Sequence, residues 1–129
     1  MSGNNLLLDT NILIYLSKKQ LKLEDFASKD DELYISFISI MEAKGYQFSN
    51  KQEERIIDSL CDNLIKVHIT DEVIKKVINF RKKHTIKLPD AIILASAIEY
   101  NLKLVTRNII DFQVAAPAHI LINPFGQNR

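Results

Sequence analysis

Short apolar runs alternate along the chain with longer segments that have helical periodicity. The apolar runs predict strands at Leu6 to Asp9, Leu33 to Phe37, Ile65 to Ile69, Lys103 to Thr106 and His119 to Ile122. The longer segments predict helices at about Asn11 to Lys19, Ser39 to Phe48, Lys51 to Asn63, Asp71 to His84 and Leu88 to Asn101. Thr10 and Thr70 are suited to cap the N-termini of the first and fourth helices. The last helix is apolar nearly all round, in the run AIILASAI, and should therefore be buried.

This alternation of strands and helices predicts an α/β fold. Parallel strands joined by right-handed helical crossovers give a sheet that is covered on both faces. In such sheets, ligands bind beyond the carboxyl ends of the strands. Asp9 falls at the end of the first predicted strand, inside the apolar run LLLDTNILIYL. An acid in such surroundings is unfavourable unless it is paired, capped or bound to a metal.

Three further acids follow predicted strands or begin predicted helices, and could therefore meet at the same edge of the sheet. Glu42 lies in the first turn of the second helix, Asp90 begins the buried helix, and Asp111 follows the KLVT strand. Each also has a purely structural alternative. Ser39 and Glu42 match a capping box, Asp90 could complement a helix dipole, and Asp111 could cap a turn.

Three blocks of the sequence, in order between Leu6 and Phe112, resemble PIN-domain ribonucleases of the kind that act as toxins of VapBC toxin–antitoxin pairs. These blocks are LLLDTNILIYL, ISIMEAKGY and KLPDAIILASAIEYNLKLVTRNIIDF. The resemblance implies a three-layer α/β/α PIN-like domain with a central parallel sheet of four to five strands. It also implies an endoribonuclease that binds Mg²⁺ or Mn²⁺ and cleaves single-stranded or structured RNA. A small antitoxin partner and a homodimer are implied as well.

By motif match, the acidic positions of the family fall on Asp9, Glu42, Asp90 and Asp111. Carboxylate oxygens suit these hard cations, so we expect Asp9 and Asp90 to be the principal metal ligands. Glu42 and Asp111 would then bind a second ion or orient the attacking water. Asn108 stands where many relatives carry an acid, and is an alternative to Asp111 as a ligand of metal-bound water. The residues expected to hold the carboxylates by hydrogen bonds are Thr10, Asn11, Thr106 and Asn108.

Basic residues flank two of the acids and are candidates for binding RNA phosphates. They are Arg81, Lys82, Lys83, Lys87 and Arg107. The first three also have a structural alternative, because cations at a helix C-terminus complement the helix dipole.

The size and composition are those of one globular domain spanning residues 1–129, of which 47% are hydrophobic and 26% charged. Cys61 is the single cysteine and permits no internal disulfide, which fits a reducing cytoplasm. No apolar run approaches the roughly 20 residues that cross a bilayer. The net charge of +1 leaves the class of partner open. We therefore expect a cytoplasmic protein with no membrane association.

Two other classes of protein share some of these features. A phospho-accepting receiver domain would need adjacent acids after the first strand and a late Lys-Pro pair, whereas this chain has Asp-Thr-Asn and no Lys-Pro. A phosphatase with Asp9 as nucleophile would need a second aspartate at position 11, which is Asn11. A PIN fold that only binds RNA or a partner protein is the remaining alternative, and the retained acids argue against it.

Overall fold

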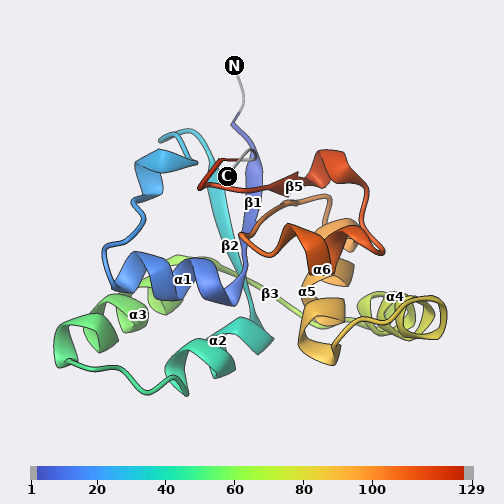
Figure 1. Ribbon diagram of the computed structural model, residues 1–129, viewed down its shortest axis with the longest axis horizontal. Coiled ribbons are helices and arrows are strands. Elements are labelled where there is room, and N and C mark those ends of the chain that lie inside the picture. Colours follow the sequence, from blue (N-terminus) through green and yellow to red (C-terminus); the bar gives the residue numbers. More distant parts are fainter. Residues whose placement is uncertain (1–2, 127–129) are drawn as a thin grey trace.

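The computed structural model describes residues 3–126, and its centre is a five-stranded sheet with the order β3–β2–β1–β4–β5 (Figure 1). The strands are β1 (Asn5–Leu8), β2 (Glu32–Ser36), β3 (Ile65–Val67), β4 (Lys103–Val105) and β5 (Leu121–Ile122). All neighbouring strands pair in parallel. The chain moves outward from β1 to β2 and β3, then returns to the other side of β1 for β4 and β5. The strand order therefore reverses between β1 and β4, the place where parallel sheets bind ligands.

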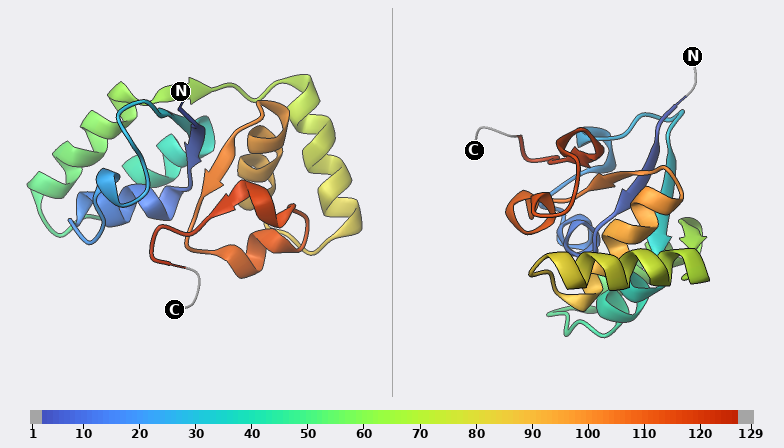
Figure 2. Two further views of the ribbon diagram at one scale, coloured as in Figure 1. Left: turned by 90° about the horizontal axis from the view of Figure 1, so that it is seen from above. Right: turned by 90° about the vertical axis from the view of Figure 1, so that its right-hand side faces the viewer.

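Helices cover both faces of the sheet, which confirms the predicted three-layer α/β/α architecture (Figure 2). The helices are α1 (Thr10–Ser17), α2 (Phe37–Lys44), α3 (Lys51–Asn63), α4 (Asp71–Lys83), α5 (Leu88–Glu99) and α6 (Ile109–Gln113), with short 3-10 turns η1 (Leu23–Asp25) and η2 (Ala118–Ile120). α1 and α3 pack on one face, and α4, α5 and α6 on the other.

Side chains of β1 alternate between the two cores, as the period of a strand requires. Leu7 packs with the buried residues of α4 and α5, whereas Leu6 and Leu8 pack with those of α1 and α3. All three leucines are at most 1% exposed. α5 contributes Ile93 and Leu94 to the first core, as its nearly continuous apolar surface predicted. β1 is thus buried from both sides, and the residue that follows it lies at the centre of the carboxyl edge.

Two predicted helix caps are wrong, and both errors concern residues near the carboxyl edge. Asp9, not Thr10, caps α1, because the Asp9 side chain accepts a hydrogen bond from the Thr10 backbone N–H at 2.8 Å. Ser36, not Ser39, caps α2, which follows β2 with no intervening loop. Ser39 is buried inside the helix, so the predicted capping box between Ser39 and Glu42 does not form. The Glu42 carboxylate is therefore available for another contact.

Other boundaries differ from the prediction because loops and short turns have weak periodic signals. α2 ends at Lys44, and Gly45 follows as its C-cap with a hydrogen bond from its N–H to the Met41 carbonyl at 3.0 Å. The predicted last strand is divided into η2 and the two-residue strand β5. α6, which contains Asp111, was not predicted. The predicted bounds of α3 and the Thr70 cap of α4 are confirmed.

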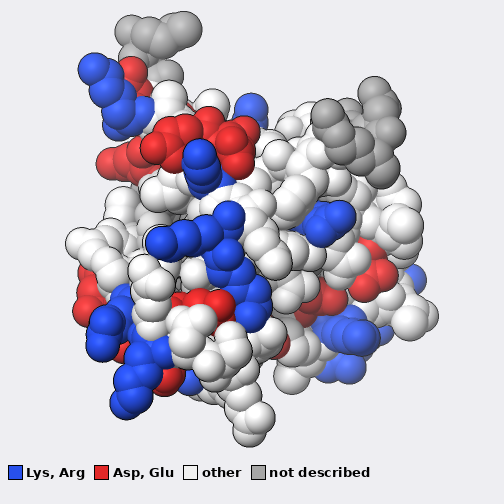
Figure 3. Space-filling view, turned by 60° about the vertical axis from the view of Figure 1, so that its left-hand side comes forward, with Lys and Arg blue, Asp and Glu red and all other residues white. Residues whose placement is uncertain are grey.

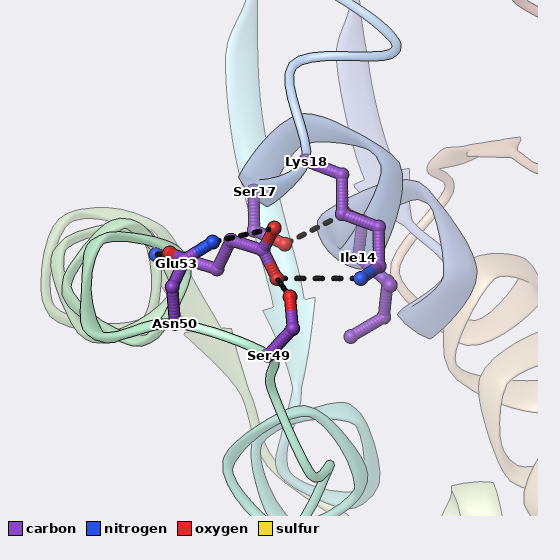
Figure 4. A network of polar contacts seen from close by, with 6 residues as sticks. All are labelled: Ile14, Ser17, Lys18, Ser49, Asn50 and Glu53. Atoms are coloured by element: carbon purple, nitrogen blue, oxygen red, sulfur yellow. Dashed lines mark hydrogen bonds and ion pairs between the residues drawn. The ribbon is translucent and has the colours of Figure 1, made fainter.

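A polar network joins the end of α1 to the start of α3 (Figure 4). The Glu53 carboxylate accepts a hydrogen bond from the Lys18 ammonium at 3.3 Å, and others from Ser49 at 3.4 Å and Asn50 at 3.3 Å. The Lys18 and Glu53 side chains are 25% and 15% exposed, so solvent screens this pair only in part. The network holds α1 in place, and α1 begins at the acids of the carboxyl edge.

Charged side chains of both signs lie close together on the face that carries α1 and α3 (Figure 3). Among the described residues this face therefore offers no extended basic surface. Within residues 3–126, no helix combines the length and the apolar character that a bilayer span requires.

Candidate active site

Asp9 is the most deeply buried acid of the carboxyl edge, with only 5% of its surface exposed. Its backbone N–H donates to the Val105 carbonyl at 3.0 Å, which ties the end of β1 to β4. One carboxylate oxygen accepts from the Thr10 N–H at 2.8 Å, and the other accepts from the Thr106 hydroxyl at 2.8 Å. The carboxylate is thus fixed at the point where the strand order reverses.

Burial is the main reason why the pKa of Asp9 is raised from 3.8 to about 6. The hydrogen bonds from Thr106 and Thr10 oppose this rise, and the negative charges of Asp90 and Glu42 add to it. The two other acids must therefore lie close enough to repel the Asp9 charge. At neutral pH the ionised Asp9 is held in surroundings that disfavour its charge.

Asp90 lies in the first turn of α5, one residue after Pro89, and its side chain is half-buried. Burial raises the pKa of Asp90, and the charges of Asp111 and Glu42 raise it further. The Lys87 ammonium acts in the opposite direction. The structure thus brings the four predicted acids to the same edge, where they interact electrostatically.

Glu42 and Asp111 are exposed, and each is linked to the buried part of the site by a hydrogen bond. The Thr10 hydroxyl donates to the Glu42 carboxylate at 2.6 Å and is also hydrogen-bonded to Ser39. The Asn108 amide donates to the Asp111 carboxylate at 2.8 Å.

The Asn108 backbone N–H also donates to the Thr106 hydroxyl at 2.9 Å, and that hydroxyl in turn donates to Asp9. A continuous set of hydrogen bonds therefore leads from Asp111 to Asp9. Asn11, by contrast, is exposed, and within the described residues its side chain makes no hydrogen bond.

The donor set of this edge is entirely oxygen, which suits Mg²⁺ or Mn²⁺. A divalent cation would also relieve the repulsion that raises the pKa values of Asp9 and Asp90. Among residues 3–126, no three Asp, Glu, His or Cys side chains are gathered tightly enough to hold an ion by themselves. The residues therefore fit a cation that takes one or two carboxylates directly and reaches the others through water, as Mg²⁺ commonly does.

Four of the candidate RNA-binding cations lie in the last turn of α4 or just before α5. Arg81, Lys82 and Lys83 form the exposed last turn of α4. Lys87 precedes α5 and acts directly on the pKa of Asp90. It is therefore the cation of this group with an electrostatic link to the acids.

Arg107 packs against two aromatic side chains. Its guanidinium donates to the Tyr15 hydroxyl at 3.1 Å, and its central carbon lies 4.4 Å from the centre of the Phe125 ring. The two rings contact each other edge to face at 4.9 Å. Neither Tyr15 nor Phe125 could be connected with the site from the sequence, because no local pattern relates residues so far apart in the chain.

The fold is all-parallel α/β/α, and four acids lie at the edge where the strand order reverses. Together these features define the class to which the protein belongs. The chain belongs to the PIN domain family, whose model matches residues 6–116. This is a family of nucleases, and the match excludes the receiver-domain alternative.

Solved structures agree with this assignment. The chain is 34% identical to a chain of a toxin–antitoxin complex from Klebsiella pneumoniae, with a TM-score of 0.67, covering 92% of this chain and 97% of that one. It is 28% identical to a chain of VapBC-1 from nontypeable Haemophilus influenzae, with a TM-score of 0.63 and coverages of 84% and 90%. The VapBC2 structure from Rickettsia felis shares the fold at 24% identity, with a TM-score of 0.75 and coverages of 92% and 98%. These likenesses make the chain a VapC-like PIN domain. No curated protein matches it.

Proposed function

We propose that this protein is a metal-dependent endoribonuclease and the toxin of a type II toxin–antitoxin pair. The single observation that carries the proposal is Asp9, a buried acid whose pKa is raised while Asp90 and Glu42 add negative charge beside it. The cap of α1 does not require this added negative charge, which disfavours the ionised carboxylate at neutral pH. This arrangement is expected of a site that binds a cation and a phosphodiester.

In this proposal Asp9 and Asp90 hold the divalent ion, Mg²⁺ or Mn²⁺, directly or through water. When bound, the ion lowers the pKa of a water molecule and neutralises charge that develops on the scissile phosphate. Glu42 and Asp111, which are exposed, would accept hydrogen bonds from water and orient the attacking molecule. Thr106, Thr10 and Asn108 keep the carboxylates in position through their hydrogen bonds.

Positive charge next to the acids would position the RNA backbone. Lys87 and Arg107 are the cations that we assign to phosphate contacts near the site, and Arg81, Lys82 and Lys83 extend the basic surface along α4. Such contacts fix the register of a nucleic acid but carry little sequence information.

Exposed apolar side chains beside the acids support a protein partner. Met41, Leu88 and Ile110 are 62%, 47% and 73% exposed, and each lies within two residues of an acid of the site. We propose that a small antitoxin covers this apolar rim, in keeping with the toxin–antitoxin complexes that the chain resembles. Ile74 and Ile78, one turn apart on α4 and 45% and 50% exposed, are the apolar pair that we assign to a homodimer contact.

RNA cleavage by the purified chain tests the proposal. We expect cleavage of single-stranded RNA in Mg²⁺ or Mn²⁺, none in EDTA, and a loss on the order of a hundredfold or more in Asp9→Asn and Asp90→Asn. Asp62→Asn changes an exposed aspartate of α3 and is the matched control. Full activity in Asp9→Asn would refute the mechanism.

RNA-end mapping after brief expression in cells, comparing the parent with Asp9→Asn, would then locate the cleaved RNA. A parent that binds RNA but never cleaves it under any metal condition would instead be a PIN-fold binding module.

A further inference from the structure

A cavity of about 510 Å³ opens beside the acids, between α6 and the segment of η2 and β5. Arg107 and Asn108 line it from the carboxyl end of β4, and Asn123 lines it just after β5. Its volume is within the range of sites that bind small organic groups, ~300–1,000 Å³. The cavity therefore lies on the same edge of the sheet as the candidate active site.

Asn108 belongs to both the cavity and the acid site. It lines the cavity, while its amide donates to the Asp111 carboxylate at 2.8 Å and its backbone N–H donates to Thr106. Thr106 in turn donates to Asp9. A nucleic-acid strand with a phosphate at the acids would thus have its neighbouring nucleotide beside the cavity.

The chemistry of the lining suits a nucleobase better than a phosphate. Among the described residues, Arg107 is the only cation that lines it, and Ile109 and Leu121 provide an apolar surface. Amide side chains offer both donors and acceptors, which is what the edge of a base requires. Gln113 makes no side-chain hydrogen bond among the described residues, and Asn123 uses only its carbonyl oxygen, which accepts from the Phe125 N–H at 3.0 Å.

The Arg107 side chain that lines the cavity is already restricted in its conformation. Tyr15 and Phe125 hold the guanidinium by a hydrogen bond and by ring contacts, as described above. An arginine that is fixed in this way loses little further entropy when a ligand binds, and guanidinium planes stack well on bases.

We infer that this cavity is a nucleobase subsite, which receives one unstacked base of the single-stranded RNA next to the phosphate that is cleaved. The inference rests on the proposed ribonuclease function. It goes further by assigning base recognition to residues of α6, η2 and the end of β5, whereas the acids act on the backbone alone. Sequence preference would then come from Gln113 and Asn123.

An abasic scan measures this subsite without cleavage. Binding of short fluorescent RNAs, each lacking one base at a different position, is measured by anisotropy with Asp9→Asn as the non-cleaving protein in Mg²⁺. We expect one position at which loss of the base weakens binding about tenfold, as base stacking contributes in other single-strand sites. In Asp9→Asn combined with Ala118→Phe, which places an aromatic ring in the cavity, that position should become no more sensitive than its neighbours.

Val114→Phe is the matched control, because it adds an aromatic ring at the exposed end of α6 outside the cavity lining. Gln113→Ala is a second variant, which removes an amide without adding bulk. It is made in the protein that retains Asp9, and it should change the base preferred at the cleaved position. Circular dichroism and the melting temperature confirm that each variant is folded.

The two proposals fail in different ways. The subsite proposal is wrong if the parent cleaves RNA but no position of the abasic scan is sensitive. It is also wrong if Ala118→Phe leaves the sensitive position unchanged. Either result would leave the cavity to a protein partner. A sensitive position in the abasic scan, with no cleavage by the parent in any metal, supports the subsite and overturns the nuclease. Absence of RNA binding overturns the subsite directly.

Discussion

Replacing Asp9 by asparagine removes one negative charge from the centre of the carboxyl edge while keeping the size of the side chain. The amide oxygen of asparagine can still accept the hydrogen bond from the Thr10 N–H, so the cap of α1 is retained. The Thr106 hydroxyl, which donates a hydrogen bond to the Asp9 carboxylate in the parent, loses this acceptor. The variant therefore removes the charge of Asp9 and one hydrogen bond, while the cap of α1 is kept.

The magnitude follows from the raised pKa of Asp9. A rise from 3.8 to about 6 is roughly two pKa units, which corresponds to about 3 kcal/mol of stability. Because the folded state holds the proton more tightly than the unfolded state, the stabilising contribution is present below pH ~4 and is lost as the pH rises to ~6. The Thr106 hydroxyl keeps its hydrogen bond from the Asn108 N–H but loses its acceptor, which reduces the gain by about 1 kcal/mol. We expect Asp9→Asn to be about 2 kcal/mol more stable than the parent at pH 7.5 and no more stable at pH 4.

Urea unfolding followed by circular dichroism measures both values, provided that the m-values of the two proteins agree. The same titrations in Mg²⁺ should stabilise the parent more than the variant, since the ion binds the folded parent and relieves the buried charge. An Asp9→Asn protein that is less stable than the parent at pH 7.5 would show that Asp9 is chiefly a structural cap. Equal differences at both pH values would refute the electrostatic reasoning.

Three further changes test other parts of the site and the fold. Thr106→Val keeps the shape of the side chain but removes the hydroxyl between Asp9 and Asn108. We expect it to weaken Mn²⁺ binding, measured by calorimetry, about 10–100-fold. Unchanged affinity would mean that this hydrogen bond does not orient the carboxylate. Lys87→Gln removes the cation that lowers the pKa of Asp90, and should weaken RNA binding with a salt slope smaller by about one, whereas an unchanged slope would exclude a phosphate contact. Leu94→Ala opens a cavity at a fully buried position of α5 and should lower the free energy of unfolding by about 2–5 kcal/mol in thermal or urea denaturation; a loss below ~1 kcal/mol would contradict its place in the core.

Much of the fold could be predicted from the sequence because it follows from local patterns. The continuous apolar run before Asp9 requires a strand that is buried on both faces, and the all-apolar helix after Asp90 requires a central place against the sheet. Once strands and helices alternate, parallel pairing brings the strand ends to one edge. For this reason the convergence of Asp9, Glu42 and Asp90 could be expected before any coordinates, although their catalytic roles stay predictions.

The details of that edge could not be predicted, because neighbouring residues compete for the same hydrogen bonds and tertiary contacts decide between them. Asp9 and Thr10 are both good N-caps, and packing of β1 against β4 selects Asp9. Thr10 then donates to Glu42, for which the sequence had offered Ser39 as an alternative, purely structural partner.

The contacts of Arg107 with Tyr15 and Phe125, and the cavity beside them, form only when α1, α6 and the segment after β5 come together. Tyr15 and Phe125 lie at opposite ends of the chain, and no periodic signal links them to Arg107. The layers of the fold and the edge where the acids meet thus follow from hydrophobic periodicity, which is a local property of the chain. The pairing of polar groups and the space left for a ligand depend instead on contacts between distant segments, which form only in the folded molecule.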